Sequence, residues 1–100
     1  MKTYRQGDIL FKKVAVLPEK RTLKNDNIVA EGEATGHKHM VHGGHLFETD
    51  VGMFVESLSD DMTTIVHDEH AEIALPEGFY QVVRQREEVG PTLPPRMVRD

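Results

Sequence analysis

The stretch GHKHMVHGGHLFETD, residues 36–50, decides how the rest of the chain is expected to fold. Its central Gly-Gly pair is a two-residue hairpin signal, because both central positions of a type I′ turn need positive φ. A turn there places His39 directly opposite Glu48 on the returning strand. Side chains alternate faces along a strand, so His37 would lie on the same face. The stretch therefore predicts a hairpin with two histidines and a carboxylate on one face.

The histidines of the chain gather in two segments. Four of the six lie in residues 37–45, and the other two bracket an acidic pair in the sequence HDEH at 67–70. Neutral imidazoles and carboxylates that converge from different segments are the usual ligands of divalent transition metals. The residues expected to hold a Zn, Mn, Ni or Fe ion are His37, His39, Glu48 and His70, with His67 as the substitute for His70. Catalytic roles are expected for His67, Glu69 and His70.

Two other interpretations of this hairpin stay open. Met40 and Phe47 lie on the opposite face and could be the buried pair, which would leave the histidine face as an ordinary solvated surface. Alternatively, the histidines could act as acid–base groups without a metal. A shift of the turn by one residue would also reverse both faces.

Composition limits the class of protein. The chain has 100 residues, 38% of them hydrophobic and 29% charged, which suits a single soluble domain. The absence of cysteine excludes disulfides and thiolate zinc sites. A net charge of −5 argues against non-specific binding to nucleic acid. No apolar run approaches the length of a membrane span and no signal-peptide core is visible, so we expect no membrane association and a cytoplasmic location.

Short runs of β-branched and aromatic residues alternate with turn signals, and no window shows a helical period of 3.6. The sequence therefore predicts an all-β domain, a small β-barrel or sandwich of seven or eight short strands. The expected strands are residues 9–17, 28–34, 37–42, 45–50, 51–58, 62–67, 71–75 and 79–85. The domain is expected to span residues 1–89, followed by a proline-rich C-terminal tail at 90–100.

The order of His-x-His, a downstream glutamate and a later P-x-G resembles the metal motifs of cupins, which are small β-barrels. By this resemblance, His37, His39 and Glu48 correspond to the first motif, and Pro76 and Gly78 to the second. The gap before the glutamate is longer than in cupins. The position of the second motif's histidine is occupied by Gln81, so His67 or His70 would have to replace that ligand.

A second resemblance covers most of the chain. The segments RQGDIL at 5–10, TGHKH at 35–39, HDEH at 67–70 and LPEGFYQVVRQRE at 75–87 are similar to a group of short, uncharacterised prokaryotic and phage proteins. The resemblance implies a small β protein and assigns no activity.

Three functions follow as expectations. The first is metal-dependent hydrolysis of a phosphodiester or another small anionic substrate. The second is a non-catalytic module, of the phage type, that binds a protein or ligand. The third is a metal-free nuclease that uses paired histidines as acid and base. Exposed sheet edges also suggest a homodimer.

Overall fold

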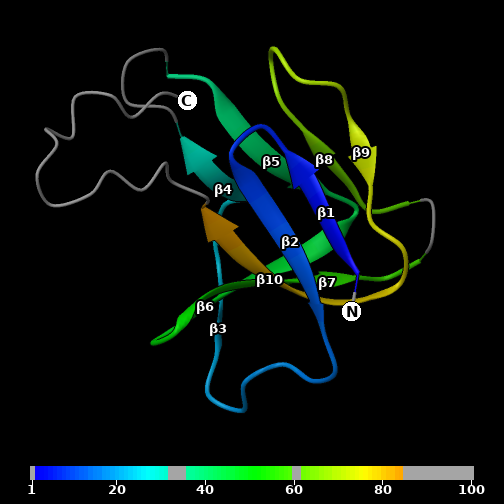
Figure 1. Ribbon diagram of the computed structural model, residues 1–100. Coiled ribbons are helices and arrows are strands. Elements are labelled where there is room, and N and C mark those ends of the chain that lie inside the picture. Colours follow the sequence, from blue (N-terminus) through cyan, green and yellow to red (C-terminus); the bar gives the residue numbers. More distant parts are fainter. Residues whose placement is uncertain (1, 32–35, 60–61, 85–100) are drawn as a thin grey trace, which may run out of the picture.

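The computed structural model describes residues 2–31, 36–59 and 62–84, which form ten strands and no helix (Figure 1). The strands are β1 (Thr3–Gln6), β2 (Ile9–Val14), β3 (Thr22–Leu23), β4 (Ile28–Glu31), β5 (Lys38–His42), β6 (Gly44–Thr49), β7 (Gly52–Ser57), β8 (Thr64–Val66), β9 (Ile73–Ala74) and β10 (Gly78–Arg84). They form two antiparallel sheets, one ordered β1-β2-β10-β7-β6-β3 and the other β4-β5-β8-β9. The predicted all-β class is confirmed. Within these ranges there is no helix of the length and apolarity that a membrane crossing requires.

The two sheets share one apolar core. In β2, Ile9 and Phe11 are buried, Leu10 between them is half-buried and Lys12 is exposed, which is the alternation of a strand with one buried face. Residues from both sheets meet in the core, so neither sheet can bury its apolar face alone. The buried apolar residues of this cluster are Ile9, Phe11, Val29, Val41, Leu46, Val55, Ile65, Leu75 and Tyr80.

Eight of the ten strands correspond to predicted segments, and the two that were missed are short edge strands. β1 has the sequence TYRQ, with two of its four residues exposed, and β3 has only two residues. Short, polar edge strands carry little hydrophobic pattern, which is why they escape prediction. The predicted C-terminal tail and part of the predicted strand at 28–34 lie outside the described residues.

The predicted hairpin around the Gly-Gly pair is wrong, because β5 and β6 lie in different sheets. β5 pairs with β4 and β8, whereas β6 pairs with β3 and β7. Of the two glycines, Gly43 has positive φ, at 78°, and the chain passes there from one sheet to the other. The Thr63 hydroxyl donates to the Gly43 carbonyl at 2.7 Å, and a Cβ on Gly43 would collide with the Met62 carbonyl oxygen. Close backbone approach at a sheet crossing, not a tight turn, explains the glycine.

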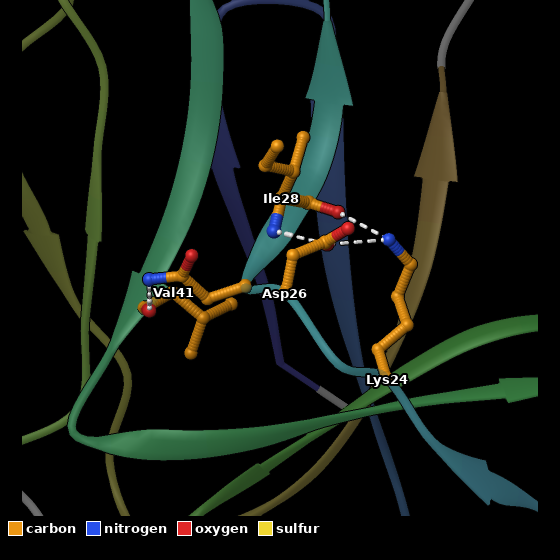
Figure 2. Close-up of polar contacts among 5 residues, drawn as sticks. Lys24, Asp26, Ile28 and Val41 are labelled. Atoms are coloured by element: carbon orange, nitrogen blue, oxygen red, sulfur yellow. Dashed lines mark hydrogen bonds and ion pairs between the residues drawn. The ribbon is translucent and has the colours of Figure 1, made fainter.

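A second connection between the sheets runs from β3 into β4, and Figure 2 shows its polar contacts. The Asp26 carboxylate accepts hydrogen bonds from the Lys24 ammonium at 2.6 Å and from the Ile28 N–H at 3.0 Å. The bond from Lys24 holds the pKa of Asp26 below its usual range. The Val41 N–H donates to the Asn27 carbonyl at 2.9 Å, so β5 is tied to the segment that enters β4.

Replacing Gly43 by alanine should destabilise the protein more than replacing Gly36, which also has positive φ, at 74°. Both changes place a Cβ in the left-handed region, at a cost of about 1–2 kcal/mol. Space is open around Gly36, whereas at Gly43 the new methyl group meets the Met62 backbone, which should add about 1–3 kcal/mol. Chemical denaturation of the two variants measures this difference. Equal losses of stability would mean that the backbones do not approach closely at the crossing.

Candidate functional site

Four of the six histidines come together where β5 lies beside β8. His39 is in β5 and His37 lies just before it, while His67 and His70 are in the loop after β8. The ring centroids of His39 and His67 are 4.2 Å apart, those of His67 and His70 are 4.5 Å apart, and those of His39 and His70 are 5.9 Å apart. His37 lies 5.8 Å from His67 by the same measure. We call these four residues the histidine cluster.

His39 is the buried member of the cluster, with 4% of its surface exposed, and Gln6 at the end of β1 fixes its ring. The amide nitrogen of Gln6 donates to the carbonyls of Ile65 at 2.8 Å and Ala71 at 2.9 Å. The amide oxygen of Gln6 therefore faces His39 Nδ1, at 2.8 Å. An amide oxygen only accepts, so Nδ1 of His39 carries the proton and donates. The neutral ring then keeps its lone pair on Nε2.

Asp8 and Arg84 border the cluster on the side of His39 Nε2. Asp8 follows β1 in the turn before β2, and its Oδ1 lies 3.9 Å from His39 Nε2. Its other oxygen, Oδ2, lies 3.4 Å from Nε of Arg84, the last residue of β10. One edge of the site thus combines an imidazole lone pair, a carboxylate and a guanidinium.

The loop after β8 holds the other two rings through local contacts. The backbone N–H of Glu69 donates to His67 Nδ1 at 2.9 Å, and the Glu69 carboxylate lies 3.4 Å from His37 Nδ1. His70 packs on Gly7, where a Cβ would lie 2.7 Å from His70 Nε2. Position 7 therefore has to be glycine for the ring of His70 to lie here.

Burial keeps two of the rings neutral. It lowers the pKa of His39 to about 4, an effect that His67 and His70 reinforce and the Asp8 carboxylate opposes. Burial also lowers the pKa of His67, with further contributions from His70 and His37. An imidazole must be neutral to offer its lone pair to a metal or a proton, so both rings are in the reactive state at pH 7.

The spacing of the rings, but not their present orientation, suits a metal ion. With metal–nitrogen bonds of about 2.0–2.1 Å, two imidazoles on a tetrahedral ion have centroids about 5 Å apart. The rings of His39, His67 and His70 straddle that value. However, within residues 2–31, 36–59 and 62–84 no three His, Asp or Glu side chains form a metal-binding group as they stand. Rotation of rings is therefore required before an ion can be held.

The structure separates Glu48 from the histidines with which it was predicted to act. Glu48 is exposed in β6, where it pairs with Thr22 and Met53 in the other sheet. The expected register of His39 opposite Glu48 is wrong for the same reason as the hairpin. His42 is exposed at the end of β5, and Nδ1 of His45 lies 3.2 Å from the Glu56 carboxylate.

Sequence reasoning brought His37, His39, His67, Glu69 and His70 forward as site residues, and the structure places these five together. It missed Gln6, Asp8 and Arg84, which reach the cluster from the ends of β1, β2 and β10. The available signal was the polar run Gln-Gly-Asp between two strand-forming segments, which is turn chemistry with an amide and a carboxylate in place.

The metal-free protein should lose stability as the pH falls from about 6.5 to about 4. The pKa of His39 is lowered in the folded state, so the unfolded state binds the proton first and the free energy of unfolding declines through this window. The loss attributable to His39 should be about 3 kcal/mol. Denaturation of chelator-treated protein at several pH values measures this loss.

The controls are two histidine variants of β5. His39→Gln should show a much weaker dependence of the free energy of unfolding on pH, whereas His42→Gln, at an exposed position, should keep the dependence of the wild type. An unchanged dependence in His39→Gln would contradict the assignment.

Comparison with known proteins places the described strands in a family. A family model described as a domain of unknown function, DUF8820, matches residues 5–85, a segment that contains the histidine cluster together with Gln6, Asp8 and Arg84. No curated protein and no solved structure gives a significant match. With four fifths of its length matched, the chain belongs to the DUF8820 family.

Proposed function

We propose that the protein binds a divalent transition-metal ion at the histidine cluster. The observation that carries the proposal is the close approach of the four imidazoles of the histidine cluster, with ring centroids 4.2–5.9 Å apart in the pairs that touch. Nitrogen ligands of this kind suit Zn, Ni, Fe and, with a carboxylate, Mn. Rings this close, with two of them neutral by burial, are electrostatically suited to a cation.

His39 is the best-prepared ligand. Its Nδ1–H is held by Gln6, so its lone pair is on Nε2, the atom that also lies beside Asp8. An outer partner that fixes the tautomer and orientation of a ligating histidine is the usual companion of such a ligand in proteins. His37 and His70 complete the set of imidazoles on which the proposal relies.

The chemistry we propose for this site is hydrolysis of a small anionic substrate, such as a phosphodiester. A bound metal lowers the pKa of its water and polarises a substrate oxygen. From the chain itself, Arg84 contributes a cation beside Asp8, where it would attract an anionic group. This proposal shares with the cupin resemblance a set of histidines on a two-sheet β fold. It differs in giving no role to Glu48.

Acid–base chemistry without a metal is the second candidate, because the two rings whose pKa values are lowered are also the closest pair. His39 and His67 are neutral at pH 7 and their centroids are 4.2 Å apart. Activity that survives a chelator would favour this candidate. Metal binding without turnover, together with a stable complex, would favour a binding module instead.

Zinc, manganese or nickel should raise the melting temperature of the wild-type protein and not that of His39→Ala. A metal that binds only the folded state stabilises it by about 2.7 kcal/mol at a hundredfold excess over Kd. His42→Ala removes an exposed histidine from the same strand and should respond like the wild type. Elemental analysis of the untagged protein measures the stoichiometry.

Glu48→Gln is the second control in the same melting experiment. It should keep the metal response, because Glu48 lies in the other sheet. Loss of the response in Glu48→Gln but not in His39→Ala would place the metal away from the histidine cluster. No response in the wild type to any of the three ions would remove the proposal.

A further inference from the structure

Local hydrogen bonds give the two closest histidines opposite tautomers. Gln6 accepts from His39 Nδ1, so the lone pair of His39 is on Nε2. At His67 the partner is the backbone N–H of Glu69, which can only donate, and it donates to Nδ1. The neutral ring of His67 therefore carries its proton on Nε2. Of these two rings, whose centroids are 4.2 Å apart, His39 therefore offers a lone pair at Nε2 and His67 offers an N–H at Nε2.

We propose that the two residues have different roles: His39 ligates the metal through Nε2, and His67 is the hydrogen-bond donor to an oxyanion bound beside that metal. The inference rests on the proposed metal site. To ligate through Nε2, His67 would have to move its proton to Nδ1, where it would oppose the Glu69 N–H. To ligate through Nδ1, it would have to displace that N–H altogether. Either route breaks a hydrogen bond that the fold already makes.

The surroundings indicate the class of the second ligand. An N–H donor adjacent to a metal is suited to an anionic oxygen, such as that of a phosphate or a carboxylate. Arg84 lies on the side of His39 Nε2, with its Nε 3.4 Å from Asp8 Oδ2, and adds positive charge for the same ligand. The centroid of His67 lies 4.2 Å from that of His39 and 4.5 Å from that of His70, so an ion held by these two would have the ring of His67 as its neighbour.

The tautomers can be measured in the chelator-treated protein, without any metal. Long-range proton–nitrogen NMR spectra at pH 7 should show a protonated Nδ1 for His39 and a protonated Nε2 for His67. Gln6→Glu keeps an oxygen acceptor for His39 and should preserve its tautomer, whereas Gln6→Leu removes the acceptor and should not. The same tautomer on both rings of the wild type would overturn the assignment.

The roles are separated by cobalt binding and by inorganic phosphate. His67→Ala should change the cobalt dissociation constant less than about 3-fold, while His39→Ala should raise it about 100-fold or more. In the cobalt-loaded protein, phosphate should perturb the visible absorption, and His67→Ala should weaken that phosphate binding about 10-fold or more, since it loses a hydrogen bond to a charged group. His67→Gln restores an N–H donor and should recover part of the phosphate affinity.

Each failure has a separate meaning. If His67→Ala weakens cobalt binding as much as His39→Ala does, His67 is a ligand and the division of roles is wrong. If the wild type and His67→Ala bind phosphate equally, His67 is not the donor, although the metal site stands. If the wild type binds no cobalt, the proposed function falls and the role of His67 falls with it, while the NMR spectra still decide the tautomers.

Discussion

The buried amide of Gln6 is the interaction on which the rest of the site depends. Its nitrogen donates to two carbonyls of the β4-β5-β8-β9 sheet region, Ile65 and Ala71, although Gln6 itself belongs to the other sheet. A buried amide that left these groups unpaired would cost free energy, so the bonds hold the end of β1 against β8 and the loop that follows it. With the nitrogen committed to these carbonyls, the amide oxygen faces His39 and accepts from its Nδ1. The contact that joins the sheets therefore also orients the imidazole.

The buried histidine of the candidate site, His39, lies on the core face of β5. His39 and Val41 alternate with residues that are half-buried or exposed, so both side chains point towards the sheet interior. Burying an imidazole disfavours its charged form, and this is why the pKa of His39 falls. A histidine on the surface would cost less free energy of folding. It would, however, be protonated more readily, and its ring would be held less firmly in one orientation. Because His39 is buried at the border of the core, the chemistry proposed for the site depends on intact packing.

The sequence was sufficient to predict the all-β class and eight of the strands, because β-branched runs and turn residues are local signals. It also brought both pairs of histidines forward, since His-x-His and His-x-x-His are visible at short range. The partner of His39 could not be predicted, because the Gly-Gly pair that signals a hairpin serves here as a sheet crossing packed on Met62. Gln6 and Arg84 were missed for a related reason: they are separated from His39 by more than thirty residues, and only the strand order brings them near it.

Electrostatics inside the cluster supports the proposal that it binds a cation. Two charged imidazoles at the separation of His39 and His67 would repel each other by about 4 kcal/mol at an effective dielectric constant near 20. Positive charge on His70 or His37 would add similar repulsion, because their rings also lie close to His67. A single divalent ion gathers several lone pairs without placing positive charge on every ring, and the carboxylate of Asp8 stands 3.9 Å from His39 to offset part of its charge. Packing several protonated histidines together would be unfavourable, and this is the physical reason behind the proposal that the cluster binds a cation.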